Sequence, residues 1–211
     1  MYIPYKLKIS ERKLIVGNYK TYKDWKKTCF DEIKKNIKLN LYAQQGGRCS
    51  YCKSILDFAI CDPHLDHILD KKNYEKFGFH TKNLTLTCPK CNNKKSTKDA
   101  KARSIKKNYP SKTDYFKIYH PYYDRYEDHL YKVDDLIISW HSDKGLETIK
   151  MCNLDRVELV FGFAKEKSIS KLDLNSQLLI ALTNAYDPKK EKEVKKTILD
   201  AINNLNTIYI Y

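Results

Sequence analysis

Apolar side chains recur at every fourth position through residues 24–45, a stretch that is otherwise mostly polar. The repeated positions are Trp25, Cys29, Ile33, Ile37 and Leu41. Because an α-helix has 3.6 residues per turn, this spacing places the side chains on one face and predicts an amphipathic helix. Gly46 and Gly47 follow directly and predict where that helix ends.

Two short stretches farther along have the composition of β-strands. The sequence "ILDFAICD" at residues 55–62 predicts a strand or ribbon, and "LTLT" at residues 84–87 alternates as a second short strand does. Pro89 comes next and favours the first turn of a helix. The lysine-rich residues 94–107 are predicted to continue as a basic, helical connector as far as Pro110.

The chain beyond residue 110 carries mostly core-forming patterns. Residues 136–140, "LIISW", predict a strand that ends near Gly145. Apolar positions at helical spacing predict three helices, at residues 154–163, 172–185 and 191–205. The sequence "DP" at 187 and 188 predicts the end of the second helix. Such stripes usually serve packing rather than ligand binding.

These patterns together predict an α+β protein in three parts. Residues 1–45 form an N-terminal segment with a lead-in helix, residues 46–110 a core with a basic connector, and residues 111–211 a mostly helical region suited to partner binding. A hydrophobic content of 42% suffices for a packed core and excludes a disordered chain. Neither a membrane-spanning run nor a secretory signal is present, so we expect a cytoplasmic protein.

The charge of the chain points toward a polyanionic partner. The formal net charge is +14, which favours contacts with phosphates and the release of their counterions. Most of the basic residues are lysines, however, and a general preference for lysine raises the charge without any functional reason. The lysines of residues 94–107 are therefore either a phosphate track or a solvated helix face.

Four of the seven cysteines form two C-x-x-C pairs, Cys49 with Cys52 and Cys88 with Cys91. In a reducing compartment such pairs are typical of thiolate metal ligands, and two pairs supply a tetrahedral zinc site. A site closed by four thiolates has no open position for chemistry, so we predict a structural zinc ion. The other cysteines are expected to be small buried residues: Cys29, Cys61 and Cys152.

The segment between the two pairs contains "HLDHI", residues 64–68, which brings His64, Asp66 and His67 together. A carboxylate suits Mg²⁺ or another hard divalent ion. A histidine, whose unperturbed pKa is about 6.5, suits proton abstraction from water. On a curved or bulged ribbon both side chains can face one pocket. Asn92, which follows the second cysteine pair, offers a second oxygen ligand.

The succession "CSYC … HLDHI … NLTLTCPKCNNKK" resembles the HNH endonucleases, the ββα-metal group, in the variety with a four-cysteine zinc site. The resemblance covers about residues 40–100. It implies a two-stranded ribbon that carries Asp66 and His67 and a helix that carries Asn92. It also implies that His67 is the general base, that Asp66 and Asn92 hold a catalytic Mg²⁺ or Mn²⁺, and that DNA is cut to leave a 5′-phosphate and a 3′-hydroxyl.

The same resemblance assigns further residues. Asn83 matches the family's middle asparagine, which braces a loop and orients the catalytic histidine. Lys95 falls where the family often has a basic residue near the phosphate. Asn92 stands where many relatives have histidine, which makes it a weaker ligand. Asp70 replaces a common proline and is expected to alter the ribbon turn. The role of His64 stays open.

The stretch "HPYYDRYEDHL" offers His120, Asp124 and His129 as a second metal site, but Pro121 and the tyrosines favour a packing corner. With the following strand and "TIKMCNLDRVELV", it is similar to the region after the core in HNH nucleases of Septu-type and retron-associated antiphage systems. That resemblance implies an antiviral defence effector controlled by an ATPase partner. The alternatives are a stand-alone restriction-type or mobile-element enzyme, a nuclease that acts on RNA, and a non-catalytic zinc ribbon that binds nucleic acid or protein.

Overall fold

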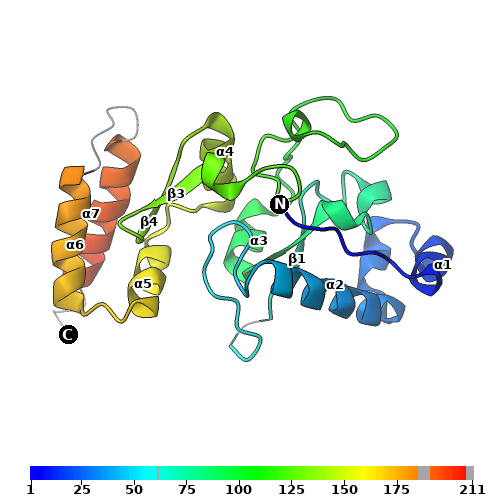
Figure 1. Ribbon diagram of the computed structural model, residues 1–211, viewed down its shortest axis with the longest axis horizontal. Helices are drawn as coiled ribbons and strands as arrows, with labels where there is room; N and C mark the ends of the chain where they lie inside the picture. The colour runs from blue at the N-terminus through cyan, green and yellow to red at the C-terminus, as the bar shows by residue number, and fades with distance from the viewer. Residues whose placement is uncertain (61, 185–190, 208–211) are drawn as a thin grey trace. The chain divides into compact units, whose positions relative to one another are not determined.

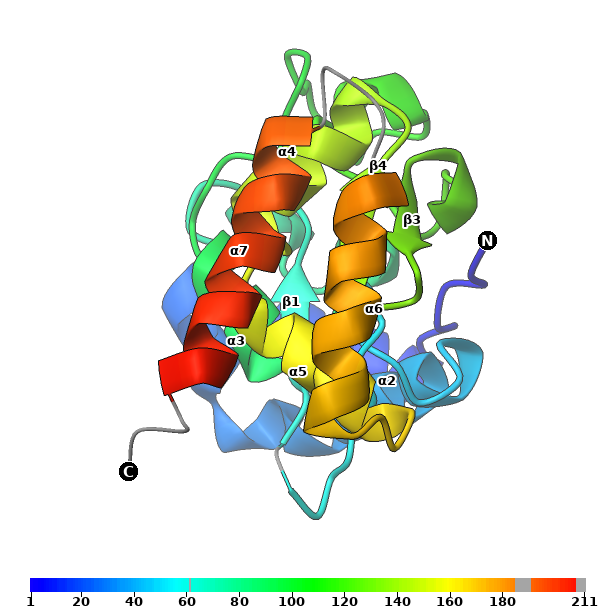
Figure 2. The ribbon, with the colours of Figure 1, turned by 90° about the vertical axis from the view of Figure 1, so that its left-hand side faces the viewer.

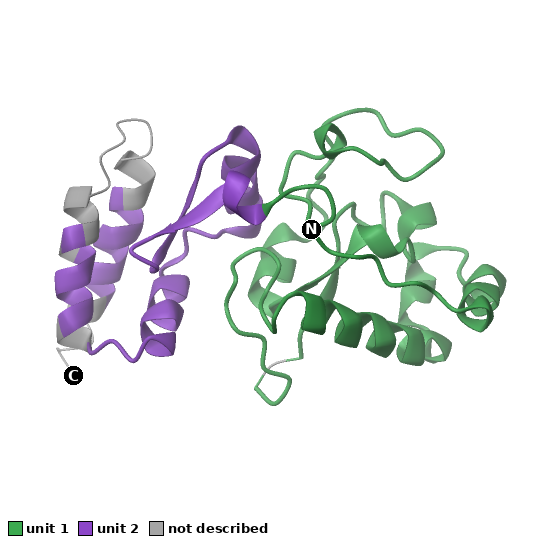
Figure 3. Cartoon of the chain, in the orientation of Figure 1, with its two compact units in different colours: residues 1–125 green, residues 126–211 purple. Residues whose placement is uncertain are grey.

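The structure is a computed structural model that describes residues 1–60, 62–184 and 191–207 (Figure 1). The chain divides into two compact units, residues 1–125 and residues 126–211 (Figure 3). In the part of the chain that is described, no helix has both the length and the apolar character needed to cross a membrane.

The centre of the first unit is an antiparallel hairpin followed by a helix. Strand β1 (His64–His67) pairs with β2 (Leu84–Thr87), and α3 (Pro89–Lys95) begins directly after β2. All four residues of β2 are buried, so this short strand is part of the core. Pro89 occupies the first turn of α3, and the Cys88 side chain caps that helix. The predicted strand at residues 84–87 and the helix opened by Pro89 are confirmed.

Helix α2 (Asp31–Gln44) packs on β2. The predicted helix is confirmed over these residues, but the prediction that it starts at residue 24 is wrong. Two short 3-10 turns, Tyr22–Lys26 and Thr28–Phe30, precede it instead. Its buried residues are Ile33, Ile37 and Leu41. Gly46 and Gly47 end the helix with φ angles of +59° and +67°, a region that glycine enters without steric cost.

The prediction of a strand or ribbon at residues 55–62 is wrong. Among the described residues of this range, only Ile55 makes a strand-like bridge, with Arg48. Asp57 then organises a turn, because its carboxylate accepts from the Ala59 backbone N–H at 2.8 Å and its carbonyl accepts from Ile60. Such local hydrogen bonds compete with strand pairing.

The basic connector at residues 94–107 is not helical beyond Lys95. Ser96 follows with a φ of +46°, which ends α3. The chain then runs in irregular conformation to a bridge between Lys101 and Phe116. The prediction that the helix continues to Pro110 is therefore wrong, because burial of Lys95 fixes the helix end.

Two of the remaining cysteines lie among the described residues. Cys152 is buried, as predicted. Cys29 is exposed, so the prediction that it is a buried residue is wrong. It lies in the second 3-10 turn, before helix α2 begins at Asp31. Cys61 lies outside the described residues.

Residues 1–22, for which the sequence predicted no element, contain helix α1 (Ile9–Asn18). Glu11 lies in its first turn and accepts from the Lys8 backbone N–H at 2.7 Å, which caps the helix. Tyr5 donates to the same carboxylate at 3.0 Å. Glu11 is buried by these contacts.

The second unit combines a hairpin with four helices. Strands β3 (Leu130–Val133) and β4 (Ile137–Trp140) pair antiparallel. The helices are α4 (Asp143–Cys152), α5 (Val157–Glu166), α6 (Lys171–Asn184) and α7 (Glu191–Thr207). Helices α6 and α7 lie side by side (Figures 1 and 2).

The predicted strand at residues 136–140 and the three predicted helices are confirmed among the described residues, except that the first of these helices begins at Val157 and not at residue 154; α4 was not predicted. The expected strand end near Gly145 is wrong, because Gly145 lies inside α4. A Cβ atom at this position would lie 2.0 Å from the His129 carbonyl oxygen, so only glycine fits there. The "DP" stop at residues 187 and 188 lies outside the described residues.

Candidate functional site

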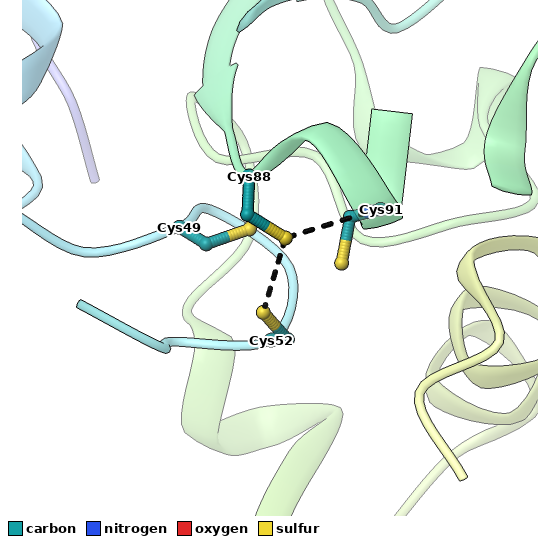
Figure 4. A group of neighbouring side chains, drawn as sticks. All are labelled: Cys49, Cys52, Cys88 and Cys91. Atoms are coloured by element: carbon teal, nitrogen blue, oxygen red, sulfur yellow. Dashed lines mark hydrogen bonds between the residues drawn. The ribbon is translucent and has the colours of Figure 1, made fainter. Parts of the chain in front are cut away.

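The four predicted zinc ligands converge in the first unit (Figure 4). Cys49 and Cys52 come from the turn after α2, and Cys88 and Cys91 from the start of α3. Their sulfur atoms all lie within 4.8 Å of one another, and Cys52 and Cys88 are 3.8 Å apart. Sulfur ligands about 2.3 Å from a tetrahedral zinc lie about 3.8 Å from each other. The thiols are not joined in disulfides, and the cluster fits a structural zinc ion.

The surrounding backbone ties this cluster to the hairpin. The Ser50 N–H, between the first two cysteines, donates to the Leu86 carbonyl at 3.0 Å. The Gln45 side chain pairs with both backbone groups of Leu86, donating at 2.8 Å and accepting at 3.0 Å. The side-chain amide thereby makes the two hydrogen bonds that a neighbouring strand would make to Leu86. The cluster and Gln45 together fix the end of α2 against β2.

His67, the predicted general base, is 5% exposed. Its Nε2 atom lies 3.0 Å from the Gly78 carbonyl oxygen. A carbonyl oxygen only accepts, so Nε2 carries the proton and the lone pair lies on Nδ1. Burial lowers the pKa of His67 well below its ordinary value, and the positive charge of Lys71 lowers this pKa further. The imidazole is therefore neutral at pH 7 and has one basic nitrogen.

Asn83 is fully buried and holds the loop that leads to Gly78. The Leu69 N–H donates to its Oδ1 at 2.8 Å. Its Nδ2 donates to the carbonyls of Leu69 at 3.0 Å and Phe77 at 3.1 Å. One side chain thus fixes both ends of the loop, and with them the neighbouring carbonyl that accepts from His67. This placement is what the predicted bracing role requires.

Two aromatic side chains from the N-terminal segment close around His67. The Trp25 ring meets the imidazole edge to face at 4.4 Å between centroids. Tyr19 packs on Phe79 at 5.1 Å and lies directly over Gly78. A Cβ atom on Gly78 would lie 2.0 Å from the Tyr19 hydroxyl. No pattern in the sequence indicates these contacts, because they join segments far apart in the chain.

Asp66, the predicted metal ligand, is 3% exposed and bonded through both oxygens. Tyr51 donates to Oδ2 at 2.7 Å, and the Lys95 ammonium lies 3.2 Å from Oδ1. Burial raises the pKa of Asp66, whereas the charge of Lys95 and the Tyr51 hydrogen bond oppose that rise. Each carboxylate oxygen accepts more than one bond, so a position on each is left for a cation.

Lys95, which the resemblance placed near the phosphate, does not lie on the pocket surface. It is fully buried, and besides Asp66 it donates to the His67 carbonyl at 2.6 Å. It fastens α3 to β1 rather than facing solvent. Lys71 lines the pocket instead and lowers the pKa of His67, although the sequence analysis did not select it. Nothing in the local sequence around Lys71 marks it out.

Asn92, the second predicted ligand, contacts His64. Its Nδ2 atom lies 3.0 Å from His64 Nδ1. An amide nitrogen donates, so His64 Nδ1 accepts and the Asn92 Oδ1 oxygen is turned away from that bond. His64, whose role stayed open in the sequence, therefore orients the amide of Asn92.

Asp66, His67 and Asn92 line one pocket of about 450 Å³, together with Asp70 and Lys71. Mg²⁺ is bound through one or two protein oxygens while it keeps several waters, and carboxylate and amide oxygens suit it. The donor set of Asp66 and Asn92 fits such an ion. The ammonium of Lys95 beside Asp66 opposes it, so a cation binds in competition with that charge.

The second candidate metal site is a packing corner, as the sequence favoured. His120 is buried, and its Nε2 lies 2.9 Å from the Tyr109 hydroxyl. Asp124 accepts from the His120 backbone N–H at 2.8 Å, and Tyr122 donates to the Leu84 carbonyl of β2 at 3.0 Å. His129 belongs to the second unit. In the described residues, the four cysteines are the only group of three or more His, Cys, Asp or Glu side chains close enough to hold a metal together.

The chain is similar to two curated bacterial proteins. Septu protein PtuB of Bacillus mycoides (strain KBAB4) is 27% identical over 86% of this chain and 68% of its own length. Over most of its length, the chain is distantly homologous to Septu protein PtuB. Septu protein PtuB of Bacillus thuringiensis is 35% identical over 33% of this chain and 27% of its own length. No protein-family model and no solved structure matches.

This homology supports the Septu part of the looser resemblance in the sequence, and the assignment as an HNH nuclease stays a prediction. It spans 86% of the chain, far beyond the cysteine-framed core. It carries no residue assignments, so the roles of Asp66, His67, Asn83, Asn92 and Lys95 stay predictions.

Proposed function

We propose that this protein is a metal-dependent endonuclease of the HNH type that hydrolyses phosphodiester bonds in DNA for antiphage defence. The observation that carries the proposal is the pocket in which Asp66, His67 and Asn92 meet. The hairpin and helix that bear these residues are the elements that the HNH resemblance implies. Distant homology to Septu protein PtuB supports the defence role.

In the proposed reaction, Nδ1 of His67 accepts a proton from a water molecule that attacks the phosphorus atom. The Gly78 carbonyl accepts from Nε2 and keeps that nitrogen protonated, so Nδ1 is the basic nitrogen that faces the reaction. The new bond joins the water oxygen to phosphorus, the bond from phosphorus to the 3′ oxygen breaks, and that oxygen takes up a proton from solvent while His67 returns its proton to solvent. The products carry a 5′-phosphate and a 3′-hydroxyl.

Asp66 and Asn92 would hold the divalent ion, which supplies a Lewis acid for the leaving oxygen. His64 orients the Asn92 amide for this purpose. Lys71 supplies positive charge at the pocket wall, where it offsets part of the charge on the phosphate. The four cysteines would hold a structural zinc that fixes the start of α3 relative to β2.

The proposal includes an ATPase partner that controls the nuclease, as the resemblance to Septu-type systems implies. The C-terminal region, residues 111–211, is the proposed docking region for that partner. A nuclease held in check by its partner would act on DNA only after release, which suits an enzyme that is toxic to its host.

The test is a plasmid assay with wild type, His67→Ala and the matched control His141→Ala. His141 lies in the second unit, where its ring stacks on Tyr131 at 4.3 Å. We expect Mg²⁺ or Mn²⁺ to support nicking by wild type and His141→Ala, and chelator to stop it. His67→Ala should keep its zinc and its circular dichroism spectrum but lose cleavage by at least about a hundredfold.

Cleavage by His67→Ala at the wild-type rate would contradict the assignment of the base. A structured RNA run in parallel separates substrates, because preferential cleavage of RNA would contradict DNA as the target. If wild type is silent alone, the same assay with the co-purified ATPase partner decides between a gated enzyme and a non-catalytic module.

A further inference from the structure

A second pocket adjoins the catalytic pocket. Its volume is about 670 Å³, and Leu65, Lys71 and Asn92 line both pockets. Helix α2 forms another part of its wall. We call this second pocket the α2 groove. A chain-like ligand that lies in it would reach the catalytic residues past Lys71.

The α2 groove is basic. Lys34, Lys35 and Lys38 line it from one helix, and Lys71 lines it beside the catalytic pocket. The three α2 lysines lie on one side of the helix, next to the buried stripe, because Lys38 follows Lys34 by four residues and Lys35 by three. Lysines of this kind act as point charges toward phosphates.

Two carboxylates offset part of this charge. Asp31 accepts from Lys34 at 2.6 Å, and Asp62 accepts from Lys38 at 2.6 Å. Both aspartates are well exposed, at 62% and 72% of their side chains. Ion pairs with such exposed carboxylates are weak, so a phosphate can replace these carboxylates. Four lysines against two aspartates leave the groove positive.

Apolar faces are exposed among these lysines. Phe58 lines the groove and is 44% exposed, while its other face leans on Tyr42 at 5.1 Å between ring centroids. Leu39 lines it too and is 51% exposed. A basic track with an accessible aromatic ring is typical of sites for single strands, because unpaired bases stack on aromatic side chains. The bases of a duplex are already stacked on each other.

The connector at residues 94–107, the other candidate track, is less suited. Lys95 is fully buried and pairs with Asp66, so its charge does not face a phosphate. Among the described residues, none of its lysines lines the α2 groove or the catalytic pocket.

We propose that the α2 groove binds an unpaired DNA strand and directs it into the catalytic pocket past Lys71. The proposal rests on the proposed function, because it names the form of DNA that the nuclease takes. The enzyme then prefers DNA with single-stranded character, such as a flap, a gap or an unwound end.

The test measures binding in the non-cleaving His67→Ala background by fluorescence anisotropy, in chelator, with a labelled single-stranded oligonucleotide. The groove variant carries Lys34→Gln, Lys35→Gln and Lys38→Gln. Its matched control carries three exposed lysines changed to glutamine in the same way, Lys106, Lys107 and Lys112. Both variants have the same net charge, so a general electrostatic effect would weaken them equally.

We expect the groove variant to bind at least about tenfold more weakly. Each lysine that no longer pairs with a phosphate of the single strand reduces the slope of log K against log salt by about 0.7, so three lysines reduce it by about 2. The control should keep the parent slope. Phe58→Ala should weaken binding roughly tenfold while leaving the slope unchanged, because stacking releases no counterions.

Equal binding by the groove variant and its control would overturn the proposal, as would tighter binding of the matching duplex or of an RNA strand. These outcomes differ from a failure of the proposed function, which the plasmid assay with an active His67 reports. Cleavage by wild type with unchanged binding by the groove variant would contradict the α2 groove proposal alone. Weakened binding by the groove variant without cleavage by wild type under any condition would contradict the nuclease proposal alone.

Discussion

The Lys95 ammonium lies 3.2 Å from Oδ1 of Asp66, and both side chains are buried. This ion pair joins α3 to β1 at the centre of the candidate site. It gives the predicted metal ligand a fixed positive neighbour, so a cation at Asp66 would bind in competition with the Lys95 charge. The pair therefore couples folding of the core to the chemistry of the pocket.

Replacing Lys95 with methionine should destabilise the zinc-loaded protein by about 3 kcal/mol, because Asp66 would stay buried without its partner. The same change should strengthen divalent-ion binding. We expect Mn²⁺ to raise the melting temperature of Lys95→Met more than that of wild type. Urea unfolding and thermal melts with and without Mn²⁺ measure both effects.

Lys94→Met is the matched control for that experiment, because Lys94 is the exposed neighbour on the same helix. It should change stability by less than about 0.5 kcal/mol. An equal response of the two variants to Mn²⁺ would contradict a cation site at Asp66.

Gly78→Ala should lower cleavage about a hundredfold while the protein still folds. The new Cβ would lie 2.0 Å from the Tyr19 hydroxyl and 2.5 Å from its Cζ atom, so the contact between the Tyr19 ring and the Gly78 backbone, whose carbonyl accepts from His67, must open. A displacement of about 1 Å at a catalytic group costs about that factor. Steady-state rates on plasmid DNA measure it.

Gly17→Ala provides the comparison. A Cβ atom on Gly17 meets nothing within 4 Å, and the residue lies in α1. This variant should keep full activity and gain up to about 1 kcal/mol of helix stability. If Gly78→Ala keeps wild-type rates, the Gly78 carbonyl does not set the orientation of His67.

The parts of the fold that the sequence predicted are those set by local patterns. The C-x-x-C spacings, the alternation at residues 84–87, and Pro89 at the start of α3 each act within a few residues. The cluster of Asp66, His67 and Asn92 followed from a family resemblance, and their common pocket agrees with it. Local chemistry and motif order therefore selected residues that share one pocket, and their roles stay predictions.

The parts that escaped prediction depend on contacts between distant segments. Residues 57–60 of the apolar run form a turn, because the Asp57 side chain satisfies the backbone locally. The burial of Lys95 depends on β1, and the requirement for glycine at Gly78 depends on Tyr19. A periodicity argument contains none of these long-range contacts.

Asn83→Leu should destabilise the protein by about 2–3 kcal/mol. The Leu69 N–H, which donates to Asn83, and the carbonyls that accept from the Asn83 amide would then be buried without partners. Activity should fall further than stability explains, since the loop carries the carbonyl that orients His67. Urea titration and cleavage assays at a temperature where the variant is fully folded separate the two effects. A variant that loses stability but keeps its rate would confine Asn83 to a structural role.

Zinc removal should unfold the first unit. In a closed four-thiolate site the binding energy is also folding energy, so Cys49→Ser and Cys91→Ser should each lose zinc and the cooperative unfolding transition. Cys29→Ser is the matched control, because that thiol is exposed and lies outside the cluster. Metal content by atomic emission and melting by circular dichroism report the result. One zinc ion per chain in wild type and Cys29→Ser, and none in the cluster variants, is the expected outcome. Retention of zinc and of the melting transition by Cys91→Ser would mean that the four sulfurs do not act together as a structural site.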